Sequence, residues 1–191
     1  MPDSAAQIAM TPRRRLIATA LAVPLFGALG RARAADPAPK ETSWEELMPK
    51  DWDPMKEFRA GDVGLVQEGS VKERNMMRQM RELWDSAPTN PQMDGARVRL
   101  PGYVVPLEEV KGELKEFLLV PYFGACIHSP PPPANQIVHV VSSTPLKGWR
   151  TMDAVWVNGT LKSSRADTAM GASGYLIADP VVERYVPKPR P

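Results

Sequence analysis

The sequence predicts a mainly β fold with one flanking helix, an α+β domain built on a small five-stranded barrel like the oligonucleotide/oligosaccharide-binding (OB) fold. Three observations support this. The 21 prolines argue against a helical bundle, because each proline removes a backbone donor and blocks helix continuation. Short apolar segments separated by turn residues follow one another from Ala96 onward. Only one long segment before them has helical periodicity.

That segment predicts a helix over residues 71–86. Ser70 and Glu73 form a capping box, in which each side chain satisfies a free amide of the first turn. Pro88 follows the end of the helix. The apolar face, which we expect to pack on the outside of the barrel, consists of Val71, Met76, Met77, Met80, Leu83 and Trp84. Upstream, residues 44–49 are typical of a short helical turn, and Trp44, Leu47 and Trp52 are expected to fasten this arm onto the domain.

The strand pattern starts with a pair or a single bent strand around Pro101-Gly102. Asn158-Gly159 between two apolar segments is the strongest short signal for a hairpin turn. The predicted strands are residues 98–105, 117–123, 136–142, 155–157, 160–161, 174–178 and 181–186.

The first residues read as an export signal. Residues 13–15 are arginines, residues 16–29 are mostly apolar, and Ala32-Arg33-Ala34 is a small-x-small cleavage pattern. We therefore expect residues 1–34 to be a cleaved signal, residues 35–43 a mobile leader, and residues 44–191 a single domain with an N-terminal helical arm. The arginines also fit a twin-arginine signal, so both export routes stay open. The rest of the chain contains no second long apolar run that would predict a membrane anchor. The expected location is therefore the periplasm.

The net charge of the predicted mature chain argues against nucleic acid as a partner. Residues 1–34 contain five arginines and one aspartate, so the predicted mature chain is slightly acidic although the whole chain carries +2. A slightly acidic domain lacks the positive surface that nucleic acid requires. The chain has one cysteine and therefore no internal disulfide. In an oxidising compartment such a thiol is expected to be buried, metal-bound or reactive.

The candidate site is formed by the only cysteine and the only two histidines, Cys126, His128 and His139. Thiolate and imidazole are ligands that zinc takes. On a strand, Cys126 and His128 would share a face. If the following strand places Ile137 opposite His128, His139 lies opposite Cys126, near enough for all three to hold one metal. Zinc is the first choice and copper, with a nearby methionine, the second. The four prolines from Pro130 to Pro133 would make a stiff connector beside the site.

A distinctive pattern is formed by residues 102–107, by Phe117 through His128 with the prolines that follow, and by Asn135-Gln136, with residues 44–49 as the lead-in. This pattern resembles a family of exported bacterial proteins, domain of unknown function 3299. The resemblance covers residues 43–178. It implies a periplasmic protein, sometimes encoded beside ABC-type export or metal-homeostasis genes, with zinc handling suggested for some members.

Three functions follow as hypotheses. The leading one is a periplasmic divalent-metal-binding protein, acting as a metallochaperone or as an accessory of an inner-membrane ABC-type transporter, with water or an unidentified carboxylate as the fourth ligand. The second is an adaptor without metal that docks onto a membrane partner. The third is a small enzyme with Cys126 as nucleophile, for which no familiar nucleophile motif is present.

Overall fold

The computed structural model describes residues 38–53, 56, 67, 69–126 and 131–186. The chain divides into a unit of residues 1–35 and a unit of residues 36–191, and all described residues lie in the second. The predicted export signal and His128 fall outside the described residues, so those two expectations stay predictions.

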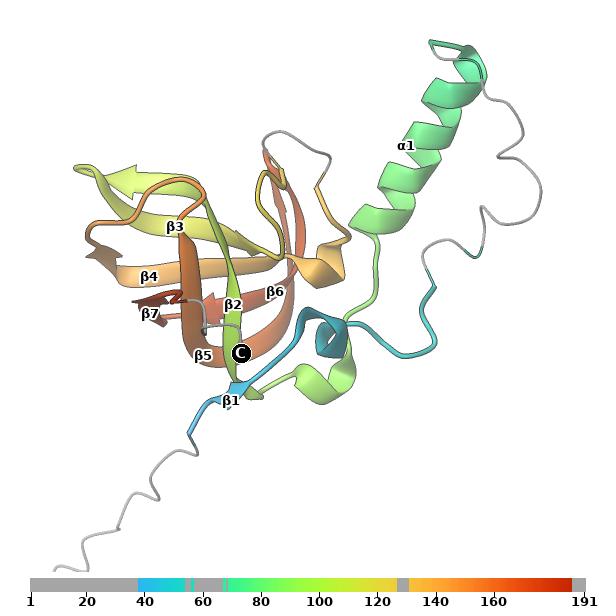
Figure 1. The fold of residues 1–191 in the computed structure, drawn as a ribbon. Coiled ribbons are helices and arrows are strands. Elements are labelled where there is room, and N and C mark those ends of the chain that lie inside the picture. Colours follow the sequence, from blue (N-terminus) through green and yellow to red (C-terminus); the bar gives the residue numbers. More distant parts are fainter. Residues whose placement is uncertain (1–37, 54–55, 57–66, 68, 127–130, 187–191) are drawn as a thin grey trace, which may run out of the picture. The chain divides into compact units, whose positions relative to one another are not determined.

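The described strands form a closed five-stranded barrel with two additional strands, as the sequence predicts (Figure 1). The barrel follows the order β2-β3-β4-β6-β5 and closes by pairing of β2 with β5. The β4–β6 pair is parallel, and the other barrel pairs are antiparallel. The barrel strands are β2 (Arg97–Val110), β3 (Glu113–Val120), β4 (Val138–Leu146), β5 (Ala154–Thr168) and β6 (Gly171–Ala178). Outside the barrel, β1 (Lys40–Glu41) runs parallel to β2, and β7 (Val181–Arg184) runs antiparallel to β5.

The long strand β2 pairs with two different strands and thereby closes the barrel. Its first half, up to Tyr103, pairs with β5, and its second half, from Tyr103 on, pairs with β3. Gly102 lies where the partner changes, and a Cβ there would come within 2.7 Å of the Val120 carbonyl oxygen. A glycine is required because the two backbones approach closely at this point. Pro101-Gly102 thus marks one bent strand, which is one of the two readings that the sequence left open.

The predicted hairpin at Asn158-Gly159 is wrong. Both residues lie inside β5, which continues through them and pairs there with β2 and β7. Gly159 is present for packing, because a Cβ at this position would lie 2.4 Å from Cγ2 of Ile177. The hairpin turns of the barrel are instead at Lys111-Gly112, between β2 and β3, and between Thr168 and Gly171, before β6.

The barrel interior is filled by one apolar cluster. Alternate residues of each strand point inward, as in the pairs Phe117 and Leu119 of β3 or Val138 and Val140 of β4. The buried members are Leu47, Val98, Leu100, Val104, Leu114, Phe117, Leu119, Val138, Val140, Val155, Val157, Leu161, Tyr175 and Ile177. A second cluster, described with the candidate site, involves the other face of β2 and β3.

The N-terminal arm attaches to the barrel as predicted. Its 3-10 helix η1 (Trp44–Leu47) buries Leu47 in the main cluster. The hydroxyl of Tyr175 in β6 donates to the Leu47 carbonyl and accepts from the Asn90 amide, both at 2.7 Å. Within the predicted leader, β1 pairs with Val98 and Arg99 of β2.

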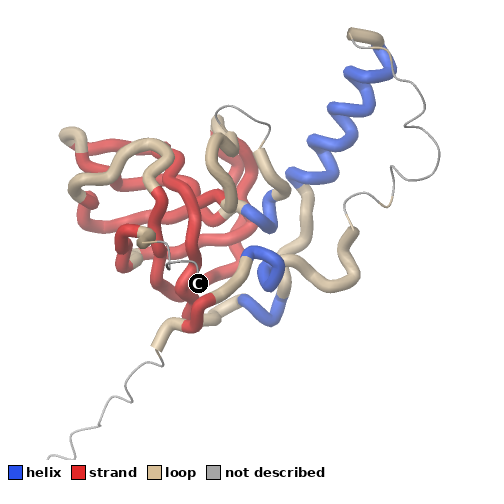
Figure 2. The backbone as a smooth tube through the Cα atoms, viewed as in Figure 1, coloured by secondary structure: helices blue, strands red, loops and turns tan. Residues whose placement is uncertain are grey.

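Among the described residues there is one α-helix, α1 (Val71–Asp85), which begins at the expected residue and ends one residue before the expected limit. Figure 2 shows that much less of the described chain is helix than strand. Ser70 Oγ accepts from the Glu73 amide at 3.1 Å, and the Glu73 carboxylate accepts from the Gly69 amide instead of that of Ser70. No residue of α1 is buried. Two further 3-10 helices, η2 (Pro91–Met93) and η3 (Ala134–Gln136), precede β2 and β4. Among the described residues, no helix is both long and apolar enough to cross a membrane.

Candidate functional site

His139 lies on the outer face of the barrel, in the middle of three strands. It is in β4, where its Cα partners are Leu118 of β3 and Leu176 of β6. Its neighbours Val138 and Val140 point inward, so the imidazole points outward. The side chain is only 16% exposed, and within the described structure its buried Nε2 atom forms no hydrogen bond. The nearest charged group is the carboxylate of Glu116, with Oε2 at 3.5 Å from Nε2.

Cys126 is not on a strand, which corrects the sequence prediction. β3 ends at Val120, and the chain turns through Pro121 and Gly124, whose φ is +84°. Cys126 itself has φ +65°, in the left-handed region that L-residues seldom adopt. The expected register is therefore wrong as well, because His139 lies opposite Leu118 and not opposite Cys126.

The turn nevertheless brings the thiol to the same outer face. A second apolar cluster, formed by Val105, Leu118, Val120, Ala125 and Ile137, covers this face, and Cys126 packs against it. Leu118 belongs to this cluster and is also the cross-strand partner of His139. The Gly124 amide donates to Met152 Sδ at 3.1 Å, which holds the turn against the loop before β5.

The Cys126 thiol is half-buried, and this decides its protonation. Burial raises the pKa of the Cys126 thiol to about 11, and the positive charge of Arg81 in α1 offsets only part of that rise. The thiol is therefore protonated at neutral pH. A nucleophilic cysteine requires the thiolate, so the geometry gives no support to the hypothesis of a cysteine enzyme. A bound metal ion, by contrast, deprotonates a coordinating thiol.

The ligand set is incomplete in the described structure. Among the described residues, no group of three or more His, Cys, Asp or Glu side chains could hold a metal ion. His128 lies outside them, so the three-residue site stays a prediction. Nothing in the sequence singles out Glu116, apart from the expectation of an unidentified carboxylate as fourth ligand.

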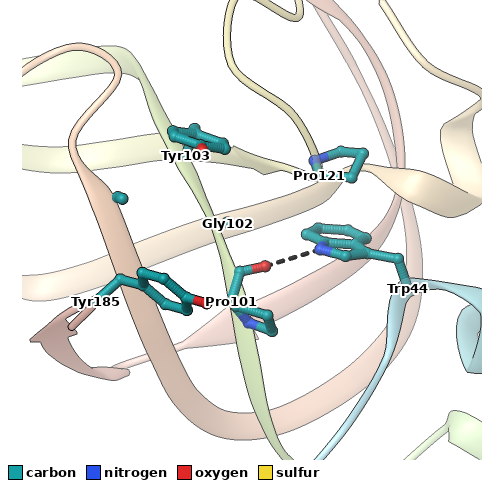
Figure 3. A pocket seen from close by; sticks show the side chains of 7 residues that line it. Trp44, Pro101, Gly102, Tyr103, Pro121 and Tyr185 are labelled. Carbon is teal, nitrogen blue, oxygen red and sulfur yellow. Dashed lines mark hydrogen bonds between the residues drawn. The ribbon is translucent and has the colours of Figure 1, made fainter. Parts of the chain in front are cut away.

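A second candidate site is an aromatic pocket of about 220 Å³ (Figure 3). Trp44 of the arm and Tyr185 after β7 lie on opposite sides of it, with Tyr103 of β2 between them. The indole N–H of Trp44 donates to the Pro101 carbonyl at 2.7 Å, which fixes the ring. The lining residues are Trp44, Pro101, Gly102, Tyr103, Pro121, Ala154 and Tyr185.

Exposed apolar side chains continue from this pocket onto the surface. The ring of Phe123, 66% exposed, contacts Tyr103 edge-to-face with centroids 5.7 Å apart. Tyr185, which packs against Trp156, is 39% exposed, and the next residue, Val186, is 75% exposed. Exposed apolar patches around a concave point are typical of binding surfaces. The sequence favours packing over binding for Trp44 and gives no local signal for this pocket.

Comparison with known proteins places the chain in a family. The sequence profile of the family described as protein of unknown function (DUF3299) matches residues 44–184. The chain belongs to the DUF3299 family. A crystal structure of a DUF3299 family protein from Pseudomonas aeruginosa PAO1 superposes with a TM-score of 0.62 at 34% identity, covering 80% of this chain and 99% of that chain. A search of curated proteins found no match.

Membership of DUF3299 confirms the resemblance inferred from the sequence. The matched residues include Cys126 and His139 and every residue that lines the aromatic pocket except Tyr185. Both candidate sites therefore lie on the part of the chain that defines the family.

Proposed function

We propose that the outer face of β3 and β4 binds a divalent metal ion, zinc as first choice and copper as second. The protein would act in the periplasm as a metallochaperone or as an accessory of an ABC-type envelope transporter. The observation that carries the proposal is the Nε2 atom of His139, which is buried, has no hydrogen-bond partner among the described residues and lies beside a carboxylate. An unsatisfied buried nitrogen costs about 1–3 kcal/mol, and a metal ion would remove that cost.

The position of this face supports the proposal. Cys126 and His139 both lie on it, and thiol and imidazole together suit zinc. In OB-type barrels, ligands bind on the face of the second and third strands, which are β3 and β4 here. This second argument is an analogy at the level of the fold.

Zinc titration by calorimetry tests the proposal. We expect one zinc per chain for the purified protein, and a large loss of affinity in Cys126→Ser and in His139→Gln. Thr144→Ala, an exposed change on the same strand, is the control and should bind as the unmodified protein does. Zinc binding that is absent, or that is equal in all of these variants, would refute the proposal. Elemental analysis of protein purified from its native cells would identify the metal.

The aromatic pocket favours a second candidate, an adaptor that needs no metal. Its size suits one ring or branched apolar side chain of a partner, and such anchored side chains dominate binding energies at interfaces. A partner that is captured in the presence of a chelator, and still captured by Cys126→Ser, would favour this function. Capture should then be lost in Tyr103→Ala. Retention of the partner by Tyr103→Ala would exclude this pocket as the contact.

A further inference from the structure

The three aromatic rings around the pocket are each held from outside it. The indole N–H of Trp44 donates to a backbone carbonyl at 2.7 Å. Trp156 packs against Tyr185 with ring centroids 5.3 Å apart and planes tilted by 36°, so it covers one face of that ring. Phe123 contacts Tyr103 edge-to-face, with the planes at 83°. In the described part of the chain, no ring contact joins Trp44, Tyr103 and Tyr185 to one another, so they surround the pocket without filling it (Figure 3). Such a preorganised pocket loses little freedom when a ligand binds.

The lining of the pocket favours a cation that forms no hydrogen bonds. None of the residues that line it has a charged side chain, so an anion finds no positive partner there. The indole N–H of Trp44 is already used, which leaves the tyrosine hydroxyls as the only other polar side-chain groups of the lining. Aromatic faces carry partial negative charge and attract a cation within about 6 Å of the ring centroid, tryptophan most strongly. The volume of about 220 Å³ is below the roughly 300–1,000 Å³ of sites for drug-sized ligands, so it suits one small head group.

The arginines near the pocket leave its electrostatics favourable for a cation, because each has a carboxylate partner. Arg99 lies over the indole ring that packs against Tyr185, with Cζ 4.1 Å from the ring centroid. Its charge is paired with Glu183, Nη2 to Oε2 at 3.1 Å. Arg184, the residue before Tyr185, lies with Nη1 3.8 Å from the carboxylate of Asp153. This part of the surface therefore already holds a cation on an aromatic face, and its own positive charges are balanced.

We infer that the pocket binds a quaternary ammonium group through cation–π contacts with Trp44, Tyr103 and Tyr185. Aromatic rings on several sides of a pocket are the usual way in which proteins recognise such a group, which has no N–H to satisfy. The group belongs either to a free small molecule such as choline or to the phosphocholine head group of a lipid. This site is independent of the proposed metal site. It competes with the adaptor function for the same pocket, because an adaptor would place an apolar side chain of its partner there.

An NMR titration of the purified protein with choline tests this site, with the indole N–H signal of Trp44 as the readout. The matched ligand is the neutral tert-butyl analogue of choline, in which carbon replaces nitrogen and the shape stays the same. We expect choline to bind about fivefold to thirtyfold more tightly than this analogue, the range of one cation–π contact from an exposed to a desolvated site. Tyr185→Leu removes an aromatic face and should weaken choline binding by a similar factor. Tyr185→Phe keeps the ring and should bind choline as the unmodified protein does.

Tyr122→Leu is the matched control, because it makes the same change at an exposed tyrosine that does not line the pocket, and it should bind choline unchanged. Thermal unfolding shows that the variants fold. Vesicles distinguish the two sources of the group. Sedimentation with phosphatidylcholine but not with phosphatidylglycerol vesicles, reversed by free choline, identifies the lipid head group, whereas binding of choline without such sedimentation identifies a small molecule.

Equal affinity for choline and its neutral analogue would refute the cation–π site and leave an apolar pocket, as the adaptor function needs. Choline binding that is unchanged in Tyr185→Leu, or that falls equally in Tyr122→Leu, would place the ligand elsewhere and also refute it. Cys126→Ser and His139→Gln should bind choline as the unmodified protein does. Failure of the metal site therefore leaves this result unchanged, and absence of choline binding refutes the pocket ligand alone.

Discussion

Replacing Tyr175 by phenylalanine tests how the N-terminal arm is attached to the barrel. The Tyr175 side chain is fully buried, and its hydroxyl joins the Leu47 carbonyl of the arm to the Asn90 amide. Phenylalanine fills nearly the same space, so the change removes two hydrogen bonds with little change in packing. The Asn90 amide and the Leu47 carbonyl also contact each other directly at 3.2 Å, so neither loses every partner.

The expected cost follows from these contacts. Each hydrogen bond contributes about 0.5–1.5 kcal/mol net, so two give a loss of about 1–3 kcal/mol in the free energy of unfolding. Because each backbone group keeps one partner, the further penalty for buried groups left without any bond does not apply. In a domain of this size, about 2 kcal/mol lowers Tm by about 4–8 °C.

Urea unfolding followed by tryptophan fluorescence measures this loss. Tyr185→Phe is the matched control, since that ring is 39% exposed, and its effect should stay within about 0.5 kcal/mol. The m-value should not change, because the two folded states bury similar surface. A change below about 0.5 kcal/mol in Tyr175→Phe would refute the assignment of this hydroxyl as the link between arm and barrel.

Four further predictions concern the thiol, the barrel and the metal. The rate of Cys126 alkylation should rise up to about pH 11; a plateau near pH 8.5, the ordinary cysteine pKa, would contradict its burial. Because folding raises this pKa, the contribution of the thiol to stability is fully present below about pH 8.5 and is lost as pH rises toward 11. Cys126→Ser should remove the part of that decline that begins below about pH 10, where Tyr122 and Tyr175, whose pKa values are also raised, are still protonated. Gly159→Ala should destabilise the protein by about 1–3 kcal/mol in urea unfolding, since its Cβ meets Ile177; an unchanged midpoint would show that the strands adjust freely. Zinc at about 100 times its Kd should stabilise the protein by about 2.7 kcal/mol, measured by thermal unfolding, and His139→Gln should show no such gain.

The sequence predicted the structure correctly where apolar and polar side chains alternate regularly along a strand. The apolar segment of residues 136–142 predicts a strand, and the structure has β4 there, with Val138 and Val140 in the interior cluster and His139 on the outer face. The helix limits also followed from local chemistry, because Ser70 and Glu73 act within a single turn. Such features depend on neighbouring residues only.

Predictions failed where distant contacts decide the conformation. Asn158-Gly159 has the composition of a turn, but the need for space beside Ile177 keeps this glycine within a strand. The apolar segment from Phe117 predicted a strand through Phe123, yet Phe123 is exposed and the chain turns at Pro121. Pro121 and Gly124 were the available signal for that turn. No local signal predicts that Glu116 lies beside His139, because this contact depends on the register that pairs Leu118 with His139.

The double pairing of β2 has a consequence for the synthesis of the chain. Its first half finds its partner only at residues 154–160, more than fifty positions later. Until those residues are available, one edge of β2 presents unpaired amides and carbonyls, which other strands can extend into aggregates. Pairing over such separations is slow. A product that stops before Thr160 is therefore expected to collect in insoluble material, and a cell that makes this protein has reason to keep the growing chain accompanied by chaperones until the last strands emerge.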